Sequence, residues 1–287
     1  MSGASPVLCQ NVLPIDVSKV QGAEQSLHTD SVAVEEPLEI QLCAPSADDS
    51  AAKSISITMR TPGNDEELSL GFLFTEAIIT GANQIASVRH CGEEDPDTGF
   101  RNVIRIELAP RVQVDLTRLE RHFYTTSSCG VCGKASLTAL RVAGQKPMTN
   151  VTTTFDRGDL VALPEKLRLR QEVFARTGGL HAAAAFGPDG EITLVREDIG
   201  RHNAVDKVIG ALLLSDRLPA HELGLLVSGR ASFELMQKAL VAGFPLLAAV
   251  GAPSSLAVSL AKEFDMTLVG FLRRGNFNIY SRAERLA

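Results

Sequence analysis

Three short and nearly continuous apolar segments alternate with helical segments in the last third of the chain. The apolar segments are residues 223–227, 245–250 and 266–272, and the helical pattern covers 231–241 and a stretch that ends at Phe264. Strands that are apolar along their whole length are buried on both faces, which is typical of parallel sheets covered by crossover helices. The alternation therefore predicts a βαβαβ unit and places the chain in the α/β class.

The N-terminal part of the chain has a less regular pattern. Residues 31–42 alternate well enough for one or two strands, and residues 54–60 alternate cleanly. The second segment predicts a strand that is half-buried through Ile55, Ile57 and Met59.

A helix and a pair of strands are expected next. Asn64 or Asp65 is the expected cap of a helix that runs to Ile79, and residues 86–91 and 102–108 are expected to pair as strands. These elements predict an α+β region ahead of the βαβαβ unit.

The middle of the chain contains a helix, a hairpin and a second helix. Residues 165–176 have a helical pattern that glycines after Thr177 end. A Gly-Pro-Asp-Gly turn separates apolar segments at 180–186 and 191–195, and a helix is expected to continue through Leu214.

The 287-residue chain is therefore expected to have three parts. Residues 1–28 lack periodicity and predict a flexible tail, residues 29–143 predict the α+β region, and residues 144–287 predict an α/β cofactor-binding region.

Composition narrows the class of protein. The net charge is −6, with 45% hydrophobic and 22% charged residues, which is typical of a globular protein and argues against a nucleic-acid coat. The chain has no apolar run of the roughly 18 residues that a membrane span needs, and its first residues do not resemble a signal peptide. The five cysteines are an odd number, and three of them, Cys9, Cys43 and Cys91, are scattered without framework spacing, which suits a reducing cytoplasm.

A pair of cysteines, Cys129 and Cys132, stands in a run of glycine, serine and lysine at residues 127–134. Residues 134–142 have a helical pattern, so the two thiols are expected at a helix N-terminus. Unpaired N–H groups and the helix dipole stabilise an anion there, which lowers the pKa of a thiol. The motif predicts a nucleophilic thiolate.

Other uses of a CxxC pair fit less well. A structural zinc site needs two more ligands at regular spacing, whereas Cys91, His122 and His181 are isolated. The zinc-deaminase signature fails, because Ser128 replaces its proline and alanine stands where the general acid/base glutamate is required. A thioredoxin-like pair fits the flanking pattern only loosely. We therefore expect a thiolate that accepts and passes on a group, without a metal.

Each predicted strand of the last third ends in a turn that contains glycine, hydroxyl groups or arginine. In an open parallel sheet the carboxyl ends of the strands meet at one edge, where ligands bind. Small residues let N–H groups approach an anion, and arginine suits phosphate. One such turn alone is more often ordinary, but three predict a site for a pyrophosphate-bearing nucleotide or cofactor. Its expected residues are Ser228, Gly229, Arg230, Ser254, Arg273, Arg274, Gly275 and Asn276.

Titratable groups are concentrated at residues 197–203, with Asp206 and Lys207 following on the predicted helix. His202 suits a proton shuttle, because the pKa of histidine lies near neutrality. It suits equally well a capping or hydrogen-bonding role that holds the loop. The sequence leaves both interpretations open.

Ordered blocks along residues 30–282 resemble the formate dehydrogenase accessory sulfurtransferase family, FdhD. The blocks are GFLFTE at 71–76, SSCGVCGK at 127–134, TGGLHAA at 177–183, EDIGRHNAVDK at 197–207, SGRASFE at 228–234, APSSLA at 252–257 and GFLR at 270–273.

The resemblance implies a cytidine-deaminase-like α/β fold without deaminase activity. It implies transfer of sulfur from a cysteine desulfurase to the molybdenum cofactor, bis-molybdopterin guanine dinucleotide, in the service of formate dehydrogenase. Cys129 matches the cysteine expected to carry the persulfide, with Cys132 in support, and a guanine nucleotide would mimic part of the cofactor. The resemblance also suggests a homodimer. The matching cofactor-binding segment is Phe271, Leu272, Arg273, Arg274, Gly275 and Asn276.

Two rival functions stay open. A non-catalytic chaperone would bind the guanine dinucleotide and dock on formate dehydrogenase without transferring sulfur. A redox sensor would use the two cysteines as a regulatory disulfide and would not bind guanine nucleotides. The glycine- and arginine-containing turns count against the sensor, and the activated thiolate counts against the pure chaperone.

Overall fold

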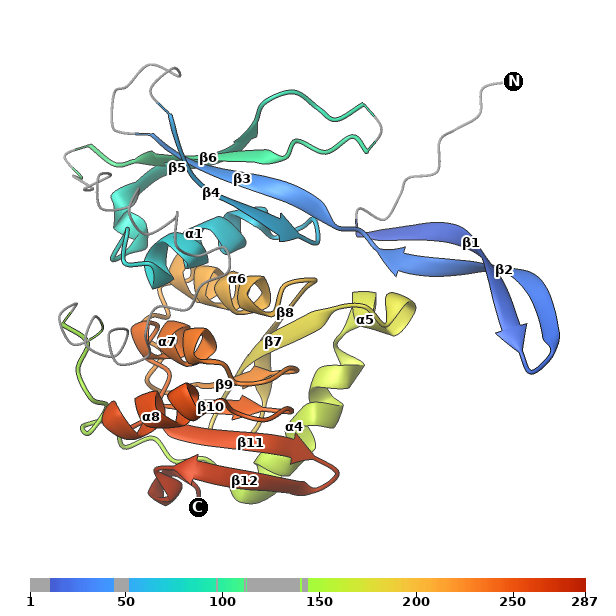
Figure 1. Cartoon of the computed structure of the whole chain (residues 1–287). Coiled ribbons are helices and arrows are strands. Elements are labelled where there is room, and N and C mark those ends of the chain that lie inside the picture. Colours follow the sequence, from blue (N-terminus) through green and yellow to red (C-terminus); the bar gives the residue numbers. More distant parts are fainter. Residues whose placement is uncertain (1–10, 44–51, 97, 111, 113–139, 141–143) are drawn as a thin grey trace.

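The computed structural model describes residues 11–43, 52–96, 98–110, 112, 140 and 144–287. The strands in these residues form a two-stranded hairpin, a four-stranded sheet and a six-stranded sheet (Figure 1). The α/β class is therefore confirmed, while the cytidine-deaminase-like arrangement and the division of the chain into domains stay predictions. In the part of the chain that is described, no helix has the length and apolarity needed to cross a bilayer.

The six-stranded sheet contains the predicted parallel unit. Its order is β12-β11-β10-β9-β7-β8, in which β9, β10 and β11 are mutually parallel and β7 and β12 flank them antiparallel. The strand β12 was not predicted, because its polar sequence has no apolar run. The strands are β7 (His181–Phe186), β8 (Ile192–Asp198), β9 (Gly224–Val227), β10 (Leu246–Ala249), β11 (Thr267–Arg273) and β12 (Asn276–Ser281).

This sheet is buried on both faces, as its apolar strands predicted. Leu225 and Val227 of β9 belong to the apolar cluster that contains three helices, whereas Leu226 between them belongs to the cluster that contains a fourth helix. Figure 1 shows the three helices on one side of the sheet and the fourth on the other. They are α6 (Arg201–Leu214), α7 (Phe233–Val241) and α8 (Ser255–Glu263) on one side and α4 (Arg157–Leu169) on the other.

The helix expected at 165–176 is two helices. The first is α4, which begins earlier because Asp156 accepts a hydrogen bond from Asp159 N–H and caps it. The second is α5 (Glu172–Thr177), which follows a break at Arg170. The predicted stop is confirmed, since Gly178 has a φ of +68° in the left-handed region.

The four-stranded sheet has the order β4-β3-β6-β5, with β3 and β6 parallel. The helix α1 (Asp65–Thr75) packs between this sheet and α6. A β-carbon at Gly71 would lie 1.9 Å from the Asp206 carbonyl oxygen, so α1 and α6 touch through their backbones. The strands are β3 (Glu36–Cys43), β4 (Lys53–Arg60), β5 (Ile85–Cys91) and β6 (Val103–Leu108).

The strand expected at 54–60 is present as β4, but its predicted buried face is wrong. Ile55 is buried, whereas 69% of Ile57 and 47% of Met59 are exposed. The register of β3 against β4 shifts between Ile40 and Gln41. A bulge adds one residue and exchanges the two faces beyond it, so the apolar side chains after Ile55 point to solvent.

The helix α1 ends before the predicted Ile79. Ala77 has a φ of +57°, which an α-helix does not accommodate. At the other end, Asn64 is the cap residue, yet its φ is +57° and its side chain makes no capping hydrogen bond. The predicted cap residue is therefore confirmed, although its side chain does not take part in the cap.

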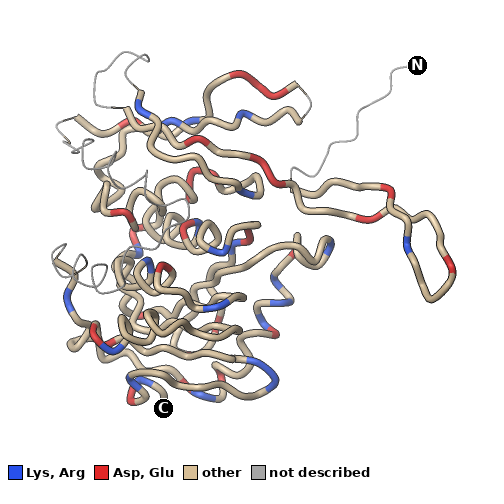
Figure 2. Tube along the Cα trace, in the orientation of Figure 1, with Lys and Arg blue, Asp and Glu red and all other residues tan. Residues whose placement is uncertain are grey.

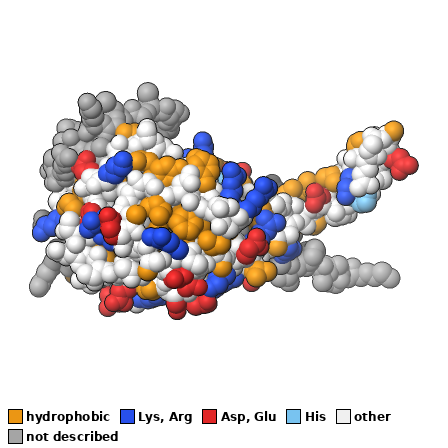
Figure 3. Space-filling view, turned by 90° about the horizontal axis from the view of Figure 1, so that it is seen from below, with side chains coloured by type: hydrophobic (Ala, Val, Ile, Leu, Met, Phe, Trp, Pro, Cys, Tyr) orange, Lys and Arg blue, Asp and Glu red, His pale blue; other side chains and the backbone are white. Residues whose placement is uncertain are grey.

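The expectation of a tail without regular structure is wrong for residues 12–28. The strands β1 (Val12–Gln21) and β2 (Glu24–Ala33) form an antiparallel hairpin that turns at Gly22, and it projects from the body (Figures 1 and 3). Most of its side chains are exposed, including 81% of Leu27. The hairpin therefore lacks the one buried face that makes a strand visible as alternation in a sequence.

Candidate functional site

The carboxyl ends of β9, β10 and β11 lie side by side (Figure 1), and the turns that follow them are hydrogen-bonded to one another. Gly251 N–H donates to the Gly229 carbonyl oxygen over 2.9 Å, and Phe271 N–H donates to the Gly251 carbonyl oxygen over 3.0 Å. Ala231 and Pro253 form a parallel bridge. The structure therefore brings the three predicted turns together at one edge. We call this edge the rim and define it as residues 228–231, 251–254 and 271–276.

Two serines fix the backbone of the rim. Ser228 Oγ accepts a hydrogen bond from Ala182 N–H of β7 over 2.9 Å. Ser254 Oγ accepts one from Ala257 N–H over 3.2 Å and caps α8. Each hydroxyl acts as an acceptor in these bonds, so its hydrogen is still able to donate to an oxyanion.

The predicted cofactor-binding segment combines a strained backbone with exposed arginines. Phe271 and Arg274 have φ angles of +54° and +51°, in a region that is unusual for residues with a β-carbon. The Arg273 guanidinium lies 5.6 Å from the centroid of the Phe271 ring. Leu272 is fully buried in the core, whereas Arg273, Arg274 and Asn276 are exposed. Figure 2 shows basic residues at this turn and along α4.

A cavity of about 500 Å³ opens beside the rim. Its wall includes His181 and Ser228 of the sheet edge, together with residues of α4 and α5. Among these, the Arg168 guanidinium stacks 4.5 Å from the centroid of the Phe174 ring. A cavity of this size is typical of small-molecule sites. The sequence did not predict the aromatic and basic wall, because no local pattern shows that the two helices reach the rim.

Two histidines lie at this edge in different surroundings. His202 Nε2 is 2.8 Å from Glu234 Oε2 and 3.5 Å from Ser232 Oγ, and the hydrogen bond from His202 is the main cause that lowers the pKa of Glu234. These contacts hold the start of α6 against α7, which favours the positioning role for His202. His181 lines the cavity, and burial, followed by the charges of Arg201 and His202, lowers its pKa.

Other titratable groups of residues 197–207 support the fold. Lys207 Nζ lies 2.8 Å from Asp198 Oδ2 and donates to the Thr61 carbonyl oxygen over 2.9 Å. Asp198 also accepts hydrogen bonds from Gly200 N–H and from Asn203 Nδ2. The Asp198 and Lys207 side chains are 0% and 2% exposed. This buried pair links β8 of the six-stranded sheet to Thr61, which follows β4 of the four-stranded sheet.

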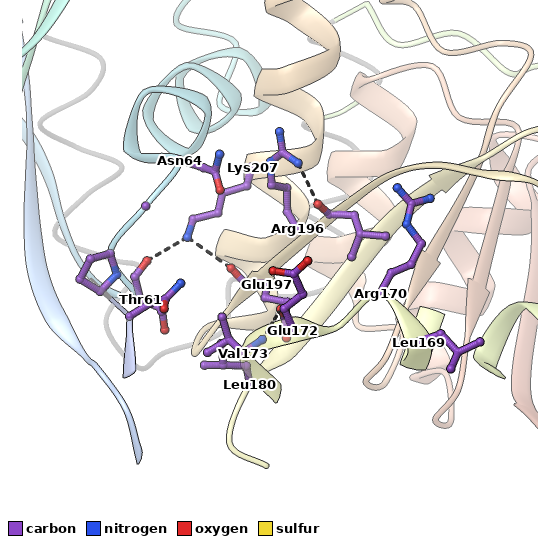
Figure 4. A pocket seen from close by; sticks show the side chains of 14 residues that line it. Thr61, Asn64, Leu169, Arg170, Glu172, Val173, Leu180, Arg196, Glu197 and Lys207 are labelled. Atoms are coloured by element: carbon purple, nitrogen blue, oxygen red, sulfur yellow. Dashed lines mark hydrogen bonds between the residues drawn. The ribbon is translucent and has the colours of Figure 1, made fainter. Parts of the chain in front are cut away.

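A second cavity, of about 410 Å³, lies between the loop before α1, the start of α5, and β8. Figure 4 shows Lys207 directed toward the backbone of Thr61 and Glu197. The Glu197 carboxylate accepts a hydrogen bond from Val173 N–H over 3.0 Å, and Arg196 is paired with a glutamate of α1. Because these charged groups are engaged within the protein, we take the cavity beside the rim as the candidate site.

The predicted catalytic cysteines, Cys129 and Cys132, and the neighbouring Lys134 lie outside the described residues. The free cysteines that are described are Cys43, which is buried, and Cys91, which is partly buried. No group of three or more His, Cys, Asp or Glu side chains that could hold a metal ion occurs in the described ranges. The role of the thiols therefore stays a prediction.

Comparisons with known proteins agree with the resemblance found in the sequence. The model of the FdhD/NarQ family matches residues 33–287. A sulfur carrier protein FdhD of Mycobacterium tuberculosis is 52% identical over 261 residues, which cover 90% of this chain and 92% of that protein. A sulfur carrier protein FdhD of Streptomyces coelicolor is 48% identical, with 94% of each chain covered, and one of Saccharolobus solfataricus is 41% identical, with 94% and 96% covered.

A solved structure supports the fold. A crystal structure from Desulfotalea psychrophila, described as that of a formate dehydrogenase accessory protein, superimposes with a TM-score of 0.72. The match covers 96% of this chain and 100% of that chain at 22% identity. At this identity the likeness concerns the path of the backbone.

Proposed function

The chain belongs to the FdhD/NarQ family, and on this premise we propose that it is a sulfurtransferase required for formate dehydrogenase activity. It carries sulfur as a cysteine persulfide from a cysteine desulfurase to the molybdenum cofactor, bis-molybdopterin guanine dinucleotide. The observation that carries the proposal is the identity of about one half to relatives named sulfur carrier protein FdhD over at least nine-tenths of the chain.

The sulfur step is a thiolate displacement. The Cys129 thiolate attacks the outer sulfur of the desulfurase persulfide, so a new S–S bond forms on Cys129 and the desulfurase cysteine leaves as a thiolate. The step exchanges one S–S bond for another and needs no further oxidant or reductant. Lys134, five residues after Cys129, stabilises the anion.

Release of the terminal sulfur from the Cys129 persulfide is also a thiolate displacement, in which Cys132 takes part. The Cys132 thiolate attacks the Cys129 sulfur and forms a disulfide, and the terminal sulfur leaves as sulfide for the molybdenum of the bound cofactor. A dithiol reductant of the thioredoxin class then reduces the disulfide by thiol–disulfide exchange, which returns both thiols and leaves the reductant oxidised. Cys132 therefore resolves the persulfide in this proposal.

The cofactor is the substrate that the rim holds. Arg230, Arg273 and Arg274 are exposed at the rim and offer donors for its phosphate oxygens. The strained backbone at Phe271 supports this assignment, because non-glycine residues with a positive φ cluster at ligand sites. We further propose that the protein acts in the cytoplasm as a homodimer, with formate dehydrogenase as the acceptor of the cofactor.

Activation of formate dehydrogenase in a strain that lacks the native protein tests the proposal. We expect the Cys129→Ala variant to abolish activation and the Cys132→Ala variant to reduce it. Cys91→Ala is the matched control, because Cys91 lies on β5, away from the rim, and this variant should activate fully. Full activation by Cys129→Ala would refute the sulfur-carrying role.

The chaperone function is the second candidate, and the exposed arginines of the rim favour it independently of the thiols. It predicts that Cys129→Ala keeps activity whereas Arg273→Ala loses it. Loss of activity in both variants excludes a pure chaperone.

A further inference from the structure

Arg201 lies beside Gly229 of the rim, although the sequence pattern of strand-end turns does not include it. It is the first residue of α6 and is only partly exposed. A β-carbon built on Gly229 would lie 3.9 Å from Arg201 Cδ and 3.5 Å from His181 Nδ1. Both side chains therefore approach the same point above the rim glycine.

The Arg201 guanidinium has one nitrogen that lacks a hydrogen-bond partner among the described residues, although its charge interacts with that of Glu234. Its Nε is buried and makes no hydrogen bond within the part of the chain that the structure describes. By contrast, Arg60 donates to Asp65 over 3.0 Å and 2.9 Å, and Arg196 is paired with Glu67. A buried donor without an acceptor costs free energy. The buried Nε of Arg201 therefore calls for an acceptor from outside the described residues, such as a bound ligand.

The surroundings of Arg201 favour an anion. His181 and His202 lie close enough for their charges to interact, and the charges of Arg201 and His202 lower the pKa of His181. Two carboxylates of this region have partners of their own: Asp198 is paired with Lys207, and Glu234, whose charge also interacts with that of Arg201, is paired with His202.

We propose that Arg201, together with His181, binds a phosphate group above Gly229 at the rim. The guanidinium supplies a fork of N–H donors that matches phosphate oxygens, and the His181 ring supplies a further donor. Gly229 leaves the space open because it has no side chain. His181 and Ser228 also line the cavity beside the rim, so the phosphate would lie at its mouth.

The identity of the ligand at this site rests on the proposed function. The binding of a phosphate group by Arg201 and His181 does not depend on the thiols. In that context Arg201 binds a phosphate of the guanine dinucleotide arm, and the exposed arginines of the rim bind the outer phosphates.

Calorimetric titration of the full chain with inorganic pyrophosphate, GDP and guanosine tests the inference. We expect Arg201→Gln to weaken pyrophosphate and GDP binding at least tenfold and to change the melting temperature little, because Arg201 Nε makes no hydrogen bond to the described residues that the variant would lose. Arg89→Gln on β5 removes the same charge at a remote place, where Arg89 lies 3.4 Å from Glu107, and should keep the affinity of the wild type.

Two further variants keep the test independent of folding. Gly229→Ala fills the space without changing charge, and His181→Asn removes the ring, so each should weaken pyrophosphate binding. Unchanged affinity in Arg201→Gln and Gly229→Ala, or no binding of pyrophosphate by the wild type, would overturn the inference.

The same titrations distinguish the source of the phosphate, and the activation assay with Cys129→Ala tests the proposed function separately. Tighter binding of GDP than of pyrophosphate supports a nucleotide, and equal affinities exclude it. If Cys129→Ala still activates formate dehydrogenase, the sulfur-carrying role falls while the Arg201-dependent affinity for pyrophosphate stands.

Discussion

At the scale of single residues, Lys207 and Asp198 form an ion pair that is almost wholly excluded from solvent. Lys207→Met leaves the Asp198 carboxylate buried without its cation. We expect a loss of about 3–5 kcal/mol in the free energy of unfolding, measured by chemical denaturation. The double variant Asp198→Asn/Lys207→Met should recover part of this loss, because no lone charge remains. A Lys207→Met variant as stable as the wild type would contradict the assignment.

His181 provides a pH-dependent prediction. Burial, then the charges of Arg201 and His202, lower its pKa below the ordinary value of about 6.5, while Asp198 acts in the opposite direction. Between the two pKa values the unfolded chain binds more protons, so His181 contributes stability above about pH 6.5 that is lost as the pH falls through the lowered pKa.

Nuclear magnetic resonance of the His181 ring measures this pKa directly. Arg201→Gln should raise the midpoint because one positive charge is removed, and bound pyrophosphate should raise it in the wild type. A midpoint at or above the ordinary value, or one that Arg201→Gln does not change, would exclude the proposed electrostatics.

The rim shows which residues a sequence can predict. Arg230, Arg273 and Arg274 follow directly from turns at strand ends, because parallel strands bring their carboxyl ends to one edge. His181 and Arg201 could not be assigned to this edge from the sequence. His181 is at the start of β7, which joins the sheet antiparallel, and Arg201 is at the start of α6, whose position beside the rim depends on the tertiary structure. For Arg201, the sequence offered only its place in the block of charged residues at 197–207.

At the scale of elements, the contact between α1 and α6 depends on glycine. A β-carbon at Gly71 would lie 1.9 Å from the Asp206 carbonyl oxygen, and one at Gly210 would lie 1.8 Å from the Glu67 carbonyl oxygen. Gly71→Ala must therefore push the helices apart, and we expect a loss of about 3 kcal/mol or more in the free energy of unfolding. Thermal and chemical denaturation measure it.

Gly179→Ala is the control for this prediction. The nearest atoms to a β-carbon there lie 3.9 Å away, so the variant should unfold close to the wild type. Equal stability of Gly71→Ala and Gly179→Ala would show that the two helices do not touch as described.

Elements with one consistent environment were predicted well from the sequence, and elements with a local exception were not. The strands β9 to β11 are apolar throughout because both their faces are covered. The predicted face of β4 was wrong because a bulge exchanges its two faces, and the hairpin of β1 and β2 was missed because it has no buried face. Alternation of apolar and polar residues indicates a strand only where one of its faces is buried and the other is exposed.

At the scale of the whole molecule, the rim assembles turns that are far apart in the sequence, and helices of the same region build the wall of the cavity beside it. In the proposed function, the position of the Cys129 motif relative to this rim decides how sulfur reaches the cofactor. The sequence predicted the chemistry of each part separately, through thiolate activation and through strand-end turns. The central claim is that the two parts serve one transfer.

Tandem mass spectrometry of the full chain after incubation with a cysteine desulfurase and cysteine tests this claim most directly. The account predicts one additional sulfur atom on the peptide that contains Cys129, and its loss when the molybdenum cofactor is added. An unmodified Cys129 in protein that has activated formate dehydrogenase, or additional sulfur on Cys91 instead, would contradict it.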